Sequence, residues 1–309
     1  MKNSSRVVGV SNAPLVPKGV GDGVPVCGAL PRERDRDLPS TAGQTRGAGG
    51  RPRRRRLCCA AMALGVAGWW VVAAPAAPTD LMTPPATGTK VLLVTGNDYP
   101  GHPWRETAPV LKGILENDPR LKVRIVEDPE ALSSPRLKEW DVIILHFMDW
   151  EVPGPSAAAR ENLRRAVEGG KGLLLTHFAC GAWDGNEWPE FVRLAGRVWD
   201  PKLRGHDPHG TFRVEIADPH HPVTKGLEGF ETIDELYTCL TGDTPIHVVA
   251  KATSKVDGKE YPMGFVLDVG QGRVFHTVLG HDARAYTNSP GVGELLRRGC
   301  AWAAKLPNR

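Results

Sequence analysis

The 309-residue sequence predicts an α/β fold, a doubly wound and mostly parallel sheet sandwiched by helices in a single domain. Three observations lead to this prediction. Short apolar runs rich in β-branched residues alternate with helix-like segments from residue 90 onward. The first and third runs are continuously apolar, as expected for strands covered on both faces. Glycines or other turn-forming residues bound most of the runs.

The N-terminal quarter of the chain differs in composition from the rest. Residues 1–56 are rich in Arg, Gly and Pro without helical or strand periodicity, and we interpret them as a disordered basic extension or an over-extended translation start. Residues 57–76 follow adjacent arginines, are uncharged and apolar, and end in small residues, which is typical of a secretory signal peptide. The run is close to the length that spans a bilayer, so an uncleaved membrane anchor is the alternative.

Residues 77–89, rich in Pro, Thr and Ala, are expected to be a linker, and residues 90–307 to be the folded domain. These features predict an exported protein, periplasmic or extracellular, that meets the membrane only through the N-terminal segment if the segment remains as an anchor. The formal charge of +4 is uneven, and the apolar run beside the arginines argues against a nucleic-acid-binding tail. Cys180, Cys239 and Cys300 lie far apart in the domain, which excludes a disulfide scaffold and a zinc site of paired cysteines.

The first half of the domain predicts four strands and two helices. An apolar run at 90–95 gives the first strand, a helix with an apolar face covers 110–115, and a second strand covers 123–126. The third strand spans 140–146, a helix spans 156–168 and stops at two glycines, and the fourth strand spans 172–176. Because crossovers between parallel strands are right-handed, the ends of these strands should lie on one edge of the sheet.

The second half predicts mainly strands. A helix is expected near 188–194, an edge strand at 212–216 from its alternating pattern, and a strand-like segment at 230–237. Further strands are expected at 248–250, 263–266 and 272–279, and a closing helix at 291–305. The chain has no Gly-x-Gly-x-x-Gly after the first strand, no Walker motif and no Gly-x-Ser-x-Gly elbow, so we expect no nucleotide cofactor.

Histidines carry the strongest chemical signal. All ten lie between positions 102 and 281, and several fall where a strand should end, among them His102, His146, His177 and His281. Functional side chains of open α/β sheets project from such strand ends. Convergent imidazoles with nearby carboxylates are how proteins bind zinc and other transition metals. Any single histidine could instead be a hydrogen-bonded loop residue, so the metal hypothesis depends on the predicted topology.

Five motifs occur in an order that resembles the trehalose-utilisation (ThuA-like) family. They are Gly101-His102-Pro103-Trp104-Arg105, the Gly-Gly-x-Gly-Leu run that ends at His177, His221-Pro222-Val223-Thr224-Lys225-Gly226-Leu227, Asp234-Glu235-Leu236-Tyr237, and Gly272-Arg273-Val274-Phe275 leading to Leu279-Gly280-His281. The resemblance covers about residues 90–305 and implies the class I glutamine amidotransferase-like fold. Amidotransferases of that class place a nucleophilic cysteine in a turn after a central strand. This chain has His177 there and Cys180 three residues later, so hydrolysis through Cys180 and His281 is only a minor alternative.

The resemblance implies a role in disaccharide or keto-sugar metabolism. We expect a sugar-active enzyme (a hydrolase, lyase or isomerase) assisted by a divalent metal such as zinc that polarises a carbonyl or activates water. His177 and His281 are the expected metal ligands or acid–base groups, with Glu235 as their carboxylate partner. The expected carbohydrate-binding residues are His102, Trp104, Arg105, Tyr237 and His206. A non-catalytic carbohydrate-binding domain is the alternative.

These functional hypotheses require one geometric result. His177 and His281 are more than a hundred residues apart in the chain, yet their imidazole nitrogens should lie close enough to share a metal, with metal–nitrogen bonds of about 2 Å. His102 and Glu235 are expected on the rim of the same cleft, at the C-terminal edge of the sheet.

Overall fold

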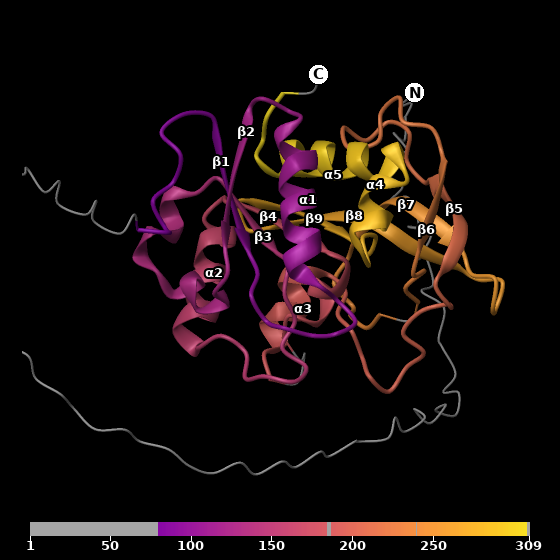
Figure 1. Cartoon of the computed structure of the whole chain (residues 1–309), viewed down its shortest axis with the longest axis horizontal. Helices are drawn as coiled ribbons and strands as arrows, with labels where there is room; N and C mark the ends of the chain where they lie inside the picture. Colours follow the sequence, from indigo (N-terminus) through magenta and orange to yellow (C-terminus); the bar gives the residue numbers. More distant parts are fainter. Residues whose placement is uncertain (1–79, 184–186, 239, 308–309) are drawn as a thin grey trace, which may run out of the picture.

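A nine-stranded sheet with the strand order β2-β1-β3-β4-β9-β8-β7-β5-β6 organises the computed structural model, which describes residues 80–183, 187–238 and 240–307 (Figure 1). The strands are β1 (Thr89–Val94), β2 (Leu121–Val126), β3 (Val142–Leu145), β4 (Gly172–Thr176), β5 (Gly210–Ile216), β6 (Phe230–Asp234), β7 (His247–Thr253), β8 (Glu260–Val269) and β9 (Gly272–Thr277). The helices are α1 (Trp104–Glu116), α2 (Ala157–Glu168), α3 (Pro189–Ala195), α4 (Ala283–Thr287) and α5 (Pro290–Ala303). Three short 3-10 helices are η1 (Pro129–Ser133), η2 (Pro135–Glu139) and η3 (His177–Gly181).

The sheet has a parallel half and an antiparallel half. Strands β2, β1, β3, β4 and β9 are parallel neighbours, and β3 and β4 are buried along their whole length. Strands β8, β7, β5 and β6 continue the sheet in antiparallel pairs. The predicted α/β class, with helices on both faces of a single domain, is confirmed.

One strand lies in a different place from the one predicted. The segment 212–216 is part of β5, which pairs with β7 on one side and β6 on the other, so β6 and not β5 lies at this edge of the sheet. The alternating exposure along β5 arises because an antiparallel sheet can bury one face and leave the other in solvent. The alternating polar and apolar residues therefore predicted the strand but not its position within the sheet.

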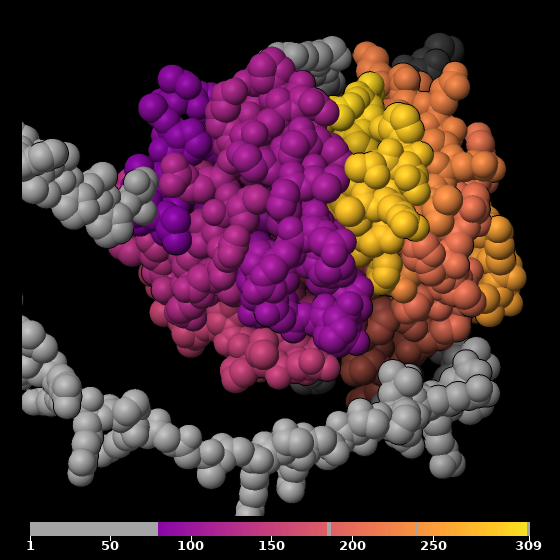
Figure 2. Space-filling model, in the orientation of Figure 1, coloured from indigo at the N-terminus to yellow at the C-terminus, as the bar shows by residue number. Residues whose placement is uncertain are grey.

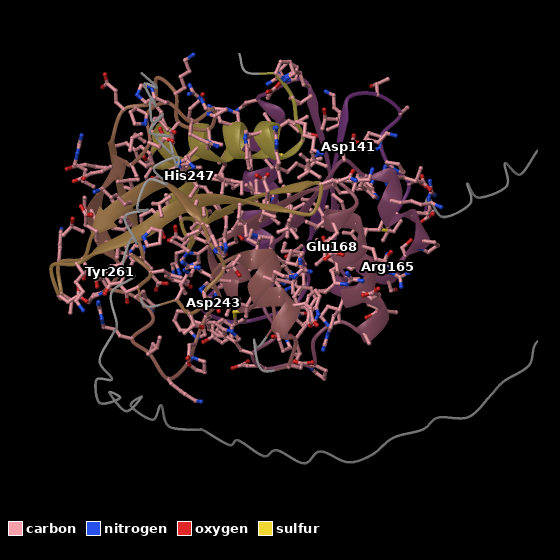
Figure 3. The ribbon with its side chains drawn as sticks, turned by 180° about the vertical axis from the view of Figure 1, so that it is seen from behind. Asp141, Arg165, Glu168, Asp243, His247 and Tyr261 are labelled. Carbon is pink, nitrogen blue, oxygen red and sulfur yellow. The ribbon has the colours of Figure 1, made fainter. Side chains whose placement is uncertain are left out.

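Helices α1, α4 and α5 pack together over one face of the sheet, and α2 and α3 cover the other. In the space-filling view α1 and the C-terminal segment form adjoining bands on the same surface (Figure 2). Seen from behind, Arg165 and Glu168 mark α2, and Asp243 marks the loop beside α3 (Figure 3). Glu168 forms ion pairs with Arg164 of α2 and Arg193 of α3, which ties these two helices together.

The predicted extension and the signal or anchor segment lie outside the described residues. Residues 80–88, which belong to the predicted linker, contact the domain: Asp80 pairs with Arg136 at 2.6 Å, and Met82 is buried. Within the described ranges, no helix has both the length and the apolar character needed to cross a bilayer.

A buried histidine in β9 makes stability depend on pH. His276 is fully buried, its Nδ1 lies 2.8 Å from the carbonyl oxygen of Ala195, and burial lowers its pKa to about 4. Protonation therefore favours the unfolded chain, whose histidine pKa is near 6.5, and stability is lost as pH falls from about 6.5 to about 4.

We predict that His276→Asn flattens this acid dependence. Asparagine can donate to the same carbonyl but does not titrate. The slope of the unfolding free energy against pH should decrease by about 1.4 kcal/mol per unit in that window. Urea denaturation between pH 4 and 7 measures it, with the exposed His220→Gln as the control. An unchanged slope in His276→Asn would show that this histidine does not control acid stability.

Candidate metal centre

Three histidines and one glutamate converge at the C-terminal edge of the parallel strands. His102 follows β1, His177 follows β4, Glu235 follows β6 and His281 follows β9. One potential ligand atom from each side chain lies within 4.8 Å of those of the other three. The imidazole rings form a triangle, with 5.3 Å between the centroids of every pair. The predicted proximity of His177 and His281 is confirmed.

The orientation of His177 is determined by its neighbours. Its Nδ1 lies 2.7 Å from the carbonyl oxygen of Val278, to which it can only donate. In a neutral ring this leaves the lone pair on Nε2, which lies 3.5 Å from Oε2 of Glu235. A hydrogen bond from the second ring nitrogen to a carbonyl is the usual way in which metal-ligating histidines are oriented.

The backbone of His177 is strained. Its φ of 42° lies in the left-handed region, and the only other described non-glycine residue with positive φ is Lys305. Such strain persists only where the surrounding structure enforces it, and it is concentrated at functional sites. Here the left-handed turn begins η3 directly after β4 and carries the imidazole into the cluster.

Glu235 is the negative centre of the cluster. Its Oε2 lies 3.1 Å from Nδ1 of His281, and its Oε1 lies 3.8 Å from Nδ1 of His206. Burial would raise the pKa of Glu235, but His177 and His281 outweigh burial and hold the pKa well below its usual range. For His281, burial acts to lower the pKa, but the adjacent Glu235 outweighs burial and raises the pKa above its usual value. Glu235 is therefore ionised at neutral pH.

His102 lies inside the cluster and not on its rim, where it was expected. It is 6% exposed and is stacked between Phe178 and Tyr99, with ring centroids 4.6 and 5.5 Å away. Burial and the adjacent His177 and His281 lower its pKa to about 2, so the ring is neutral. A neutral buried imidazole has a lone pair that can bind a metal.

Asp234, which was not among the predicted site residues, supports the backbone of the cluster. Its buried carboxylate accepts backbone N–H bonds from Glu235 at 2.8 Å, Gly280 at 2.7 Å and His281 at 3.1 Å. Burial raises its pKa, against the opposing effect of His177 and the backbone donors. The carboxylate thus joins the end of β6 to the loop after β9. The adjacent acidic pair Asp234-Glu235 was the available signal.

The donor set fits a divalent metal. His102 Nδ1 is buried and has no hydrogen-bond partner within the described part of the chain, whereas His177 Nε2 and His281 Nδ1 both face the ionised carboxylate of Glu235. Three imidazoles and one carboxylate are ligands that zinc and related transition metals accept.

The predicted carbohydrate-binding residues divide into two groups. His206 and Tyr237 lie beside the cluster: His206 is near Glu235, and the Tyr237 ring centroid is 4.4 Å from that of His177. Trp104 is 4% exposed in the first turn of α1, and its Nε1–H donates to Asp98 at 2.7 Å. Arg105 lies over the Trp104 ring and pairs with the same aspartate. The structure therefore gives Trp104 a packing role. Sugar contact by Trp104 and Arg105 stays a prediction.

Cys180 does not have the setting of a nucleophile. Its side chain is fully buried within a hydrophobic cluster, and burial raises the pKa of its thiol far above the usual range. A reactive cysteine needs a partly exposed, electropositive setting that favours the thiolate. The structure therefore argues against hydrolysis through Cys180 and His281.

A separate cavity of about 460 Å³ lies near the opposite edge of the sheet, between the end of α1 and α5. Its main charged groups pair with one another, Arg120 with Asp118 and both Arg297 and Arg298 with Glu294. The cavity is distant from the strand ends that carry the histidines. We therefore assign the site to the cluster and not to this cavity.

Comparisons with known proteins support the fold. The family model for trehalose utilisation, ThuA, matches residues 90–303. A solved structure of a ThuA-like protein from Parabacteroides merdae is 28% identical, with 71% of this chain and 90% of that chain covered and a TM-score of 0.61. A second, from Bacteroides uniformis, is 22% identical, with 74% and 95% covered and a TM-score of 0.58. No curated protein matches the sequence.

Proposed function

The chain belongs to the ThuA (trehalose utilisation) family, and from this premise we propose that it is an exported, metal-assisted enzyme acting on a disaccharide or keto-sugar. The observation that carries the proposal is the convergence of His102, His177, Glu235 and His281 on one small volume. Three imidazoles and one carboxylate from four separate chain segments form a set that a divalent metal accepts. A carbohydrate substrate is proposed from the family and from the aromatic side chains beside the cluster.

Each residue of the cluster has a distinct role in this proposal. His102, His177, His281 and Oε2 of Glu235 would hold the metal, which when bound supplies a Lewis acid for a sugar oxygen. Oε1 of Glu235 faces His206, whose side chain is 37% exposed. This pair lies within reach of a substrate above the cluster and can move a proton to or from it. Asp234 and the Val278 carbonyl hold the ligands in position.

Export is proposed from the apolar segment 57–76 and its preceding arginines. N-terminal sequencing of the mature protein recovered from its producing cells tests this part independently of the chemistry. A mature N-terminus close to residue 76 is expected for a cleaved signal. An intact N-terminus in membrane-free cytosol would contradict export.

The enzymatic proposal is tested on protein purified without chelator. Elemental analysis should find a divalent metal in a one-to-one ratio with the chain. A screen of glycosides and their 3-keto derivatives, with and without added Zn²⁺ or Mn²⁺, should find metal-dependent turnover. Absence of bound metal together with unchanged activity in His177→Ala would overturn the proposal. Sugar binding without turnover of any compound would favour a non-catalytic carbohydrate-binding domain.

A further inference from the structure

Two tryptophans that were not among the predicted site residues lie beside the cluster. Trp150, in the loop after β3, is 38% exposed although its ring contacts three other aromatic rings. Trp199, in the loop after α3, is half-buried, and its ring centroid is 5.0 Å from that of Trp150. A single exposed tryptophan would need no explanation, but this one is part of a continuous row of aromatic contacts.

This row of aromatic contacts reaches the histidine cluster on two sides. On one side the ring centroids of Trp150 and His102 are 6.1 Å apart, with an interplanar angle of 73°. On the other side Trp199 is 5.3 Å from Tyr237, which in turn contacts His177. His206 stacks on Tyr237 at 5.7 Å and adds a polar edge. Trp150 and Trp199 are therefore linked to the cluster through His102 and Tyr237.

Glycines create the space for both indoles. A Cβ on Gly181 would overlap Nε1 of Trp150, and a Cβ on Gly205 would overlap the six-membered ring of Trp199. Neither glycine has a positive φ. Backbone conformation therefore does not require glycine at these positions, whereas the close approach of the two rings does.

We propose that Trp150 and Trp199 form a subsite for the second sugar ring of a disaccharide whose first ring lies at the metal cluster. One face of a pyranose presents mainly C–H groups, which pack favourably on the electron-rich face of an indole. Ligand sites combine such apolar walls with a few convergent polar groups, here His206 and Glu235. The inference rests on the proposed carbohydrate function and specifies that its substrate has two rings.

The test compares substrates of one and two rings. Trehalose and 3-ketotrehalose are the two-ring probes, and methyl α-glucoside and its 3-keto derivative are the one-ring probes. Trp150→Ala should weaken two-ring binding by about tenfold to a hundredfold, the loss expected when a large apolar contact is removed. One-ring binding and Zn²⁺ affinity should stay within about twofold of wild type, a difference of less than half a kcal/mol. Trp150→Phe, which keeps an aromatic face, should restore most of the two-ring binding.

The outcomes distinguish a failure of the subsite proposal from a failure of the proposed carbohydrate function. Equal losses for one-ring and two-ring probes, or no loss for either, would overturn the subsite while leaving metal-dependent turnover intact. If wild-type protein binds none of the four probes, the failure is in the carbohydrate proposal itself. Gly181→Ala gives an independent second variant, since displacing the indole should reproduce the selective loss seen with Trp150→Ala.

Discussion

The variant His177→Asn should lose metal binding and turnover while remaining folded. Asparagine tolerates the left-handed backbone at φ 42°, and its amide can replace the Nδ1 donor to the Val278 carbonyl. It cannot replace Nε2, the atom that faces Glu235. Loss of this ligand should lower Zn²⁺ affinity by at least about 100-fold, since even outer-shell partners contribute 10-fold to 100-fold.

Thermodynamic linkage makes the effect measurable without a substrate. At a Zn²⁺ concentration 100 times the dissociation constant, the wild type should gain about 2.7 kcal/mol in unfolding free energy. At the same concentration a variant with 100-fold weaker affinity should gain only about 0.4 kcal/mol. Urea denaturation with and without Zn²⁺ measures both gains, and His220→Asn, at an exposed position that is not part of the cluster, serves as the control. An equal gain in His177→Asn and wild type would show that His177 is not a ligand.

The parallel half of the sheet and its histidine edge were predictable for one reason. Continuous apolar runs such as Val142–Leu145 and Gly172–Thr176 are buried on both faces, and this burial is visible directly in the sequence. Once these strands are parallel, the residues that follow them must share an edge. His177 and His281 could therefore be placed together across more than a hundred residues.

The antiparallel half was less predictable because its strands are joined by loops, and the loops do not determine which strands pair with each other. The alternation in β5 gave the correct strand but the wrong position in the sheet. The sequence also does not predict the direction in which side chains of loop residues point. Trp104 and Trp150 both follow strand ends, yet the first is buried in a helical turn and the second is exposed beside His102. Only tertiary packing distinguishes them.

Asp234 and Glu235 show the same limit within a single acidic pair. The motif identified Glu235 as the carboxylate partner of the histidines, and the structure places it among them. The acidic pair marked the position of Asp234, but side-chain spacing does not reveal that its carboxylate binds backbone N–H groups. Its three contacts join two loops that are more than forty residues apart.

We predict that Asp234→Asn weakens both the fold and the metal site although every ligand is retained. Oδ1 accepts from Glu235 and His281, and Oδ2 accepts from Gly280. An amide that keeps the first two contacts turns its NH₂ toward the Gly280 N–H and leaves a buried donor without an acceptor. This should cost about 1–3 kcal/mol of unfolding free energy in the metal-free protein.

The same change should lower Zn²⁺ affinity by about 10-fold to 100-fold, because the loop that carries His281 is no longer held in place. Zinc titration followed by calorimetry measures the affinity, and urea denaturation of metal-free protein measures the stability. The matched control is Asp268→Asn at an exposed position of β8, which should change stability by no more than about 0.5 kcal/mol and leave affinity unchanged. A loss of stability in Asp234→Asn with wild-type zinc affinity would limit Asp234 to a structural role, because a positioning residue must affect the ligands that it holds.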